Sequence, residues 1–319
     1  MRIFNNIDSY QRSQQPLWVS IGTFDGMHLG HQYLINQLKE YSHKVHEDAR
    51  TMIITFDVHP QLLFIGESPR PITTNRHKIQ LLEHTGIDDT LVMTFTPELA
   101  EVSAEDFIVD YLVEKLKISG IVLGYNNTFG HKGLGNINLL RRYAQKYDFT
   151  ALTAKPYFID DAPVSSTRIR EKLQAGDLNG AKEMLGRYFS VLGIVIKGVQ
   201  RGRELGVPTA NIKMGIGFLP PLGVYGVRVR GIDEKAHFGV ANIGYNPSFH
   251  MKNPESLKPQ LEVHLFDYSG NLYGKELTVD FITRIRDETR FNKIEDLIAE
   301  IHNDISKFKS FISENEPNL

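Results

Sequence analysis

Two histidines close a glycine-rich stretch that could handle phosphate. The run Gly22-Thr23-Phe24-Asp25-Gly26-Met27-His28-Leu29-Gly30-His31 separates a short apolar stretch from a helical pattern. Backbone N–H groups at a helix start bind anions, and glycines let the backbone approach a ligand closely. His28 and His31 are three residues apart, so two imidazoles on one helical face could donate hydrogen bonds to a reacting phosphate. A glycine-rich turn with two solvated histidines is the alternative, and the full decapeptide at this junction favours a phosphate site.

A second phosphate-binding element is predicted at residues 165–170. The run Ser165-Ser166-Thr167-Arg168-Ile169-Arg170 opens a helical pattern that extends to about residue 174. Ser and Thr are good N-cap residues, and the first turn of a helix presents unpaired amides. Arg170 could add a bidentate contact to a polyphosphate. Alone the run indicates only a capped helix, so its interpretation depends on the first motif.

A third motif combines glycines, arginines and hard oxygen ligands at residues 198–211. It reads GVQRGRELGVPTAN, and it is not a P-loop, because G-x-x-x-x-G-K-[ST] is absent from the chain. Thr209 and Asn211 are two residues apart on a predicted strand, so their oxygens could share one Mg²⁺ ion. A basic hairpin loop is the alternative.

Glu262 is a candidate general base. It lies in the alternating run LEVHLFD at residues 261–267, which puts Glu262, His264 and Phe266 on one face of a strand. The opposite face is apolar and should be core, so Glu262 faces a cleft or solvent. A carboxylate in a cleft can accept a proton from an attacking hydroxyl. The alternative, a solvated strand glutamate, is the usual role of such a residue, and spacing alone does not overturn it.

The surrounding pattern predicts two domains. Apolar strand-like runs at residues 17–21, 52–56, 91–95 and 121–123 alternate with helical patterns at 31–41, 78–84 and 104–116, which favours a Rossmann-like α/β domain with a parallel sheet. Beyond residue 186, β-rich runs at 191–196, 224–229, 261–266 and 277–281 favour a small antiparallel β-barrel, closed by a C-terminal helix at 294–308. We therefore predict domains 1–186 and 187–319.

Composition narrows the function classes. The 319 residues carry a net charge of -2 without a Lys/Arg block, which argues against a nucleic-acid partner. The chain has no cysteine, which excludes disulfides, thiolate metal sites and thiol nucleophiles and fits a reducing cytoplasmic location. The polar N-terminus predicts no signal peptide, and no apolar run is long enough to cross a membrane. A homo-oligomer stays open.

Together these motifs resemble the bacterial bifunctional riboflavin kinase/FMN adenylyltransferase (FAD synthetase) family. The N-terminal likeness rests on H-x-G-H with the later S-S-T-x-I-R, and is supported by residues 56–60, Thr73-Thr74 with Lys78, and Phe95-Thr96 with Phe107. The C-terminal likeness rests on G-R-x-L-G-x-P-T-A-N, N-I-G, E-x-H-L-F-D and R-I-R, in that order. Asn127 and Gly133 depart from the family pattern, and Ser248 replaces a more usual Thr.

The resemblance implies a set of site residues. ATP in the adenylyltransferase domain would contact Gly22, Phe24, Asp25, Gly26, His28, His31, Ser165, Ser166, Thr167 and Arg170, and flavin would contact Asn126, Phe129 and His59. ATP in the kinase domain would contact Gly198, Arg203, Gly206, Pro208, Thr209 and Asn211, with Mg²⁺ on Thr209 and Asn211. Glu262, Arg286, Phe291 and Asn242 would contact flavin there.

The resemblance also implies two reactions. The C-terminal domain would phosphorylate riboflavin with ATP, with Glu262 as general base, and the N-terminal domain would adenylylate FMN to FAD and release pyrophosphate. His28 and His31 would act on the phosphates of ATP. The alternatives are a riboflavin kinase with an impaired adenylyltransferase domain, motivated by Asn127 and Gly133, and a non-enzymatic flavin-binding regulator. The H-x-G-H shared with class I aminoacyl-tRNA synthetases is a third, which the near-neutral charge disfavours.

Overall fold

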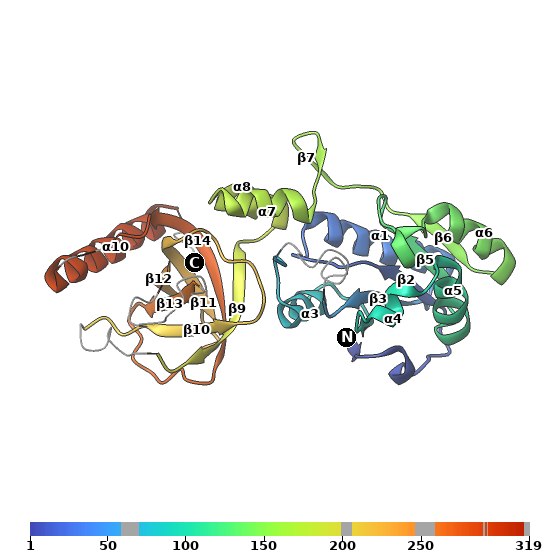
Figure 1. Ribbon diagram of the computed structural model, residues 1–319, viewed down its shortest axis with the longest axis horizontal. Helices are drawn as coiled ribbons and strands as arrows, with labels where there is room; N and C mark the ends of the chain where they lie inside the picture. The colour runs from blue at the N-terminus through green and yellow to red at the C-terminus, as the bar shows by residue number, and fades with distance from the viewer. Residues whose placement is uncertain (59–69, 199–205, 246–258, 290, 292, 316–319) are drawn as a thin grey trace. The chain divides into compact units, whose positions relative to one another are not determined.

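The computed structural model divides the chain into two compact units (Figure 1). It describes residues 1–58, 70–198, 206–245, 259–289, 291 and 293–315. The first unit comprises Met1–Pro71 and Asn75–Ser166, and the second comprises Ile72–Thr74 and Thr167–Leu319. The domain boundary near residues 186–189 stays a prediction.

The first unit is built on a parallel sheet of six strands. These are β1 (Arg2–Phe4), β2 (Leu17–Ile21), β3 (Arg50–Phe56), β4 (Asp89–Met93), β5 (Gly120–Leu123) and β6 (Thr150–Thr153), in the order β1-β4-β3-β2-β5-β6. Every neighbouring pair is parallel. The parallel α/β architecture expected from the sequence is confirmed, and β1 and β6 are added to the four strands that the periodicity predicted.

Helices cover both faces of this sheet (Figure 1). Trp18 of β2 turns toward a core that includes residues of α1 (Leu29–Val45) and α3 (Asn75–Glu83). Val19 turns the other way, toward a core shared with the π-helical segment η2 (Phe107–Lys115) and α6 (Ile137–Tyr147). Because both faces of the sheet are covered, β2, β4 and β5 are buried along their whole length, and most of their residues are apolar, as is usual in parallel strands. The helix predicted at 104–116 is a short α5 (Ala104–Asp106) that continues as η2.

The strand order creates a switch point between β2 and β5. From β2 the chain adds β3 and β4 on one side, and from β5 it adds β6 on the other. The carboxyl ends of all parallel strands meet at one edge, and ligands of such sheets bind where the order reverses. The glycine-rich decapeptide leaves β2 at this edge and leads into α1.

The second unit contains a closed antiparallel barrel of six strands. They are β9 (Phe189–Ile196), β10 (Ala210–Met214), β11 (Gly223–Arg230), β12 (His237–Gly244), β13 (Gln260–Leu265) and β14 (Glu276–Arg286), in the order β10-β13-β12-β11-β14-β9. Tyr225 and Phe281 are fully buried and pack edge to face in this unit. The predicted barrel is confirmed. The β-rich runs did not include β12. For β10 the sequence predicted only that Thr209 and Asn211 share a strand; Asn211 lies on β10, and Thr209 comes just before the first residue of β10.

Three helices complete the second unit. α7 (Ser166–Gln174), which belongs to this unit from Thr167 on, and α8 (Leu178–Leu185) precede the barrel, and α10 (Ile294–Asn315) follows it. Phe308 of α10 is buried against Phe238 and Phe266, so the C-terminal helix packs on the barrel as its periodicity predicted. Across the described residues, no helix has the length and apolar character required to cross a bilayer.

Candidate active sites

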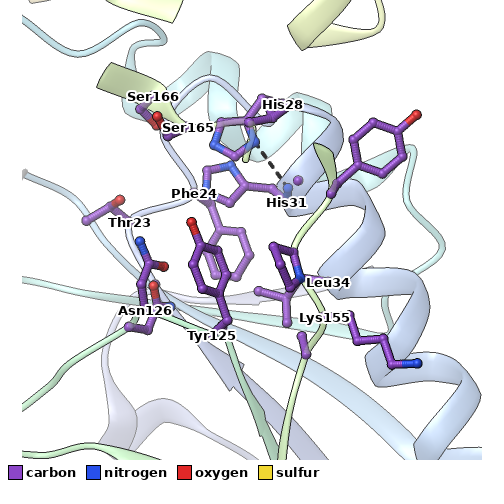
Figure 2. Close-up of a pocket in the computed structure, with 18 residues that line it drawn as sticks. Thr23, Phe24, His28, His31, Leu34, Tyr125, Asn126, Lys155, Ser165 and Ser166 are labelled. Carbon is purple, nitrogen blue, oxygen red and sulfur yellow. Dashed lines mark hydrogen bonds between the residues drawn. The ribbon is translucent and has the colours of Figure 1, made fainter. Parts of the chain in front are cut away.

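A cavity of about 200 Å³ opens at the switch point of the first unit. Three loops build it, following β2, β5 and β6, and the segment that leads into α7 adds a fourth wall (Figure 2). The lining residues are Gly22, Thr23, Phe24, His28, Gly30, His31, Leu34, Gly124, Tyr125, Asn126, Asn127, Ala154, Lys155, Pro156, Tyr157, Val164, Ser165 and Ser166. The decapeptide and the Ser165-Ser166 pair, 134 or more residues apart, therefore meet in one cavity.

The paired histidines form a stack at the start of α1 (Figure 2). Their ring centroids are 3.6 Å apart with an interplanar angle of 17°. α1 begins at Leu29, so His28 is its N-cap, and its Nδ1 accepts a hydrogen bond from the His31 backbone N–H at 3.2 Å. An accepting Nδ1 means that the neutral His28 ring carries its proton on Nε2. The helix predicted from residue 31 thus starts two residues earlier, and His28 caps it.

The loop before α1 is held in an uncommon backbone conformation. Phe24 and Met27 have φ of 50° and 42°, values that non-glycine residues adopt rarely, and Gly26 has φ of 81°. Phe24 is buried and its ring lies 5.2 Å from that of His31. Asp25 is also buried, and its carbonyl oxygen accepts a hydrogen bond from the Ser166 hydroxyl at 2.9 Å. Neither Asp25 nor Gly26 lines the cavity, so both contribute through the loop.

The second motif is helical, as predicted. Ser166 is the first residue of α7, and both Ser165 and Ser166 line the cavity. Thr167 and Arg170 lie on α7, and Arg170 is buried at 8% exposure. They belong to the second unit and are not among the residues that line this cavity, so their predicted contact with ATP stays a prediction.

Of the three residues predicted to contact flavin in the first unit, the two that the structure describes lie in different surroundings. Asn126 lines the cavity. Phe129 lies instead in the hydrophobic core, 5.8 Å from the ring of Phe107. His59 falls outside the described residues. Asn127, which departs from the family pattern, donates through Nδ2 to the carbonyl of Ile21 at 2.9 Å and so ties the β5 loop to the end of β2.

A second cavity, of about 300 Å³, lies in the second unit. Its wall is supplied by barrel strands, by α10 and by the segments that precede β10 and α10. The lining residues are Val207, Thr209, Val224, Val240, Ala241, Asn242, Glu262, His264, Arg286, Glu288, Thr289, Phe291, Leu297, Ile301 and Asp304. Glu262, Thr209, Asn242, Arg286 and Phe291 had been predicted from the sequence, and the fold brings them to this one cavity.

Glu262 lies on β13, the strand between β10 and β12, and lines this cavity. On adjacent strands it is paired with Asn211 of β10 and with Asn242 of β12. The Thr209 hydroxyl donates to its Oε2 at 3.4 Å. Burial raises the pKa of the Glu262 carboxyl, and the Thr209 hydrogen bond opposes this only in part. A raised pKa makes the carboxylate a stronger proton acceptor, which suits a general base.

The loop before β10 approaches Asn211 closely. A Cβ on Gly198 would lie 2.2 Å from Asn211 Nδ2, so only glycine leaves room for that amide. Gly206 has φ of 76°, and the carbonyl of Pro208 lies 2.9 Å from Nδ1 of His264. Gly198, Gly206, Pro208 and Asn211 do not line the cavity, and Arg203 falls outside the described residues.

Arg286 is fixed by a carboxylate from α10. Its Nε donates to both oxygens of Asp304 at 3.1 Å, and its Nη2 lies 2.9 Å from Asp304 Oδ2. Asp304 is buried at 1% exposure, which raises the pKa of its carboxyl although Arg286 opposes the rise. The Arg286 guanidinium also lies over the Phe291 ring, 5.7 Å from its centroid. The pair joins the C-terminal helix to the wall of the cavity.

Several lining residues were missed by sequence reasoning. In the first cavity these include Lys155, Pro156 and Tyr157, which follow β6, a strand of only four residues. In the second they include Leu297, Ile301 and Asp304 of α10. The helical periodicity of α10 predicted its packing but gave no sign that the packed face also borders a cavity.

Comparisons with known proteins agree with the two-part organisation. The FAD synthetase family matches residues 10–168, and the riboflavin kinase family matches residues 185–312. A bifunctional riboflavin kinase/FMN adenylyltransferase from Buchnera aphidicola subsp. Acyrthosiphon pisum is 36% identical over 96% of each chain. One from Haemophilus influenzae is 33% identical over 98% of this chain and all of its own. A crystal structure described as a macrolide-efflux protein from Streptococcus pneumoniae has a TM-score of 0.82 at 26% identity, covering 98% of each chain.

Proposed function

The chain belongs to the bifunctional riboflavin kinase/FMN adenylyltransferase family, and we propose that its two cavities divide the two reactions between them. The barrel unit phosphorylates riboflavin with ATP, and the α/β unit adenylylates the product, FMN, to FAD. The observation that carries this assignment is that each of the two family matches contains its own cavity, lined by side chains suited to its reaction.

In the α/β unit the chain acts on phosphate by position and charge. ATP binds at the start of α1, where backbone amides and the paired imidazoles can donate to its phosphates. A phosphate oxygen of FMN attacks the α-phosphorus, the bond to the bridging oxygen breaks, and pyrophosphate leaves. His28, with its proton on Nε2, and His31 stabilise the charge that grows on the phosphates. No protein nucleophile is required, because alignment and electrostatics supply the rate.

In the barrel unit the Glu262 carboxylate acts as a general base. The ribityl 5′-hydroxyl of riboflavin attacks the γ-phosphorus of ATP, its proton passes to Glu262, and ADP leaves. Burial holds the Glu262 pKa above its ordinary value, so the carboxylate takes this proton more readily than an exposed one. Arg286, held by Asp304, and Phe291 supply a cationic and aromatic wall for the flavin.

The donor set beside Glu262 fits Mg²⁺. Thr209 and Asn211 offer neutral oxygens next to a carboxylate, and the missing side chain at Gly198 leaves space for Asn211. Within the described segments no group of three or more His, Asp or Glu residues could hold a metal ion, which suits an ion bound mainly by phosphates and water. When bound, Mg²⁺ neutralises charge on the ATP phosphates. Thr209 and Asn211 are the residues that would hold it.

Product analysis tests the assignment directly. Purified protein is given riboflavin and MgATP, and FMN, FAD, ADP and pyrophosphate are followed in time. We expect FMN to appear first and FAD afterwards, with one ADP per FMN formed and one pyrophosphate per FAD. Formation of FMN without FAD would support a kinase with an impaired adenylyltransferase unit. If neither product forms, the flavin-binding regulator is the hypothesis that remains.

A further inference from the structure

One buried lysine lies beside the phosphate-binding loop without lining its cavity. Lys78 is on α3 and is 6% exposed. Its Nζ donates three hydrogen bonds: to the carbonyl oxygen of Phe56 at 2.7 Å, to the hydroxyl of Thr55 at 2.9 Å and to the carbonyl oxygen of Thr23 at 3.2 Å. An ammonium group has three N–H donors, so all of them are used.

The three hydrogen-bond acceptors of Lys78 belong to two segments at the edge of the sheet where the cavity opens. Thr55 and Phe56 end β3, whereas Thr23 belongs to the loop that follows β2 and lines the cavity. The Thr23 carbonyl also accepts from the Thr55 hydroxyl at 3.1 Å. Lys78 and Thr55 thus fix one carbonyl together, one residue before Phe24.

The Thr23 carbonyl lies next to the part of the loop whose backbone is strained. Phe24 and Met27 both have positive φ, and strained backbone of this kind persists only where surrounding contacts impose it. Turning the Thr23 peptide would rotate Phe24, whose ring packs 5.2 Å from the His31 ring in the histidine stack. Lys78 is therefore connected to the histidine stack through Thr23 and Phe24.

We propose that Lys78 is a positioning residue for adenylyl transfer, whose ammonium group holds the Thr23 carbonyl and with it the loop and imidazoles that receive the ATP phosphates. The inference rests on the proposed role of this cavity. A neutral amine has two N–H donors for the same three acceptors, so loss of the proton frees one of them. The loop then loses a restraint, and the site loses a positive charge.

The charges around Lys78 set the pH at which this loss occurs. Burial lowers the pKa of its ammonium group to about 8, and the carboxylates of Asp25 and Asp57 oppose the decrease. We therefore expect kcat/KM for ATP in FAD synthesis to fall on the alkaline side with a midpoint near pH 8. Bound ATP adds negative charge, so kcat should fall only at higher pH. Riboflavin phosphorylation by the same preparation should lack this decline.

Substitution separates positioning from mere support of the fold. Lys78→Met should lower kcat/KM for FAD formation by about 100-fold, the cost of small misplacements in a site, and should abolish the alkaline decline. The matched control is Lys39→Met: Lys39 is half-buried, lies on a helix of this unit as Lys78 does, and donates to a backbone carbonyl, that of Thr85 at 3.0 Å. It should leave FAD synthesis unchanged.

A milder pair of variants covers the case in which Lys78→Met does not fold. Thr55→Val removes one acceptor of the ammonium, so the alkaline midpoint should move to lower pH, and Thr55→Ser should restore it. The inference is overturned if Lys78→Met keeps wild-type FAD synthesis, if the decline persists in that variant, or if Thr55→Val leaves the midpoint in place. Absence of FAD from the wild-type protein would instead overturn the proposed function, so the two failures are distinguishable.

Discussion

Glu262 and Asn211 stand directly opposite each other on two neighbouring strands of the barrel, although 51 positions of sequence separate them. Paired residues on neighbouring strands point to the same face of a sheet. The pairing therefore sets a carboxylate and an amide side by side, and Thr209 adds a hydroxyl 3.4 Å from Glu262. This arrangement joins the predicted base to the predicted Mg²⁺ ligands, and the predictions for the kinase follow from it.

Replacing the base tests its role. Glu262→Gln keeps the size of the side chain but cannot accept the proton, so FMN formation should fall by about 10²–10⁴-fold. Riboflavin binding, measured by fluorescence quenching, should persist, and FAD synthesis from added FMN should continue. Unchanged riboflavin turnover would remove Glu262 as the base.

The rate of riboflavin phosphorylation should also decrease in acid, at a pH higher than the ordinary pKa of a glutamate. Burial raises the pKa of Glu262 above its ordinary value of 4.5, and only the ionised carboxylate accepts a proton. The acidic limb of kcat/KM for riboflavin should therefore lie above pH 4.5. Stability gives an independent check of the sign. Between the ordinary and the raised value the folded state binds more protons than the unfolded state, so the free energy of unfolding should decrease as pH rises. Glu262→Gln should remove that decrease.

The histidine stack predicts two separable effects. His31→Ala removes a phosphate donor and should reduce FAD synthesis by about 10²–10³-fold, while riboflavin phosphorylation continues. His28→Ala should add a folding defect of about 1 kcal/mol, because His28 is the N-cap of α1. His28→Asn retains a capping side chain, so its thermal unfolding should match the wild type although FAD synthesis is lost. Loss of both activities from folded His31→Ala protein would contradict two independent sites.

The Arg286–Asp304 pair predicts a coupling between α10 and the flavin. Asp304→Asn removes the buried charge that holds the Arg286 guanidinium, so KM for riboflavin should rise more than KM for ATP. The free energy of unfolding should decrease by about 2 kcal/mol, a usual value for hydrogen bonds to charged groups. Lys309→Met is the control, since Lys309 and Asp267 form an exposed pair at 4.0 Å, and such pairs contribute little. Equal effects of the two variants on KM would contradict the coupling.

The sequence determined the two architectures and most of the chemistry. Largely apolar runs such as β2 and β5 indicate strands buried on both faces, and short β-rich runs with Gly and Pro indicate a barrel. Candidate residues could be identified in the decapeptide and around Glu262 because local spacing is enough to predict a strand–helix junction in the first case and one face of a strand in the second. Short strands such as β6 carried too weak a signal, so the wall that includes Lys155 and Tyr157 was missed.

Only the tertiary structure decided which of these residues meet. Sheet order placed the loops after β2, β5 and β6 around one cavity, and strand order and register in the barrel set Glu262 between Asn211 and Asn242. It also put Phe129 in the core and tied Lys78 to the Thr23 carbonyl. Periodicity tells which way a side chain points from its own element, but contacts between distant elements depend on strand order and register, which no local pattern encodes.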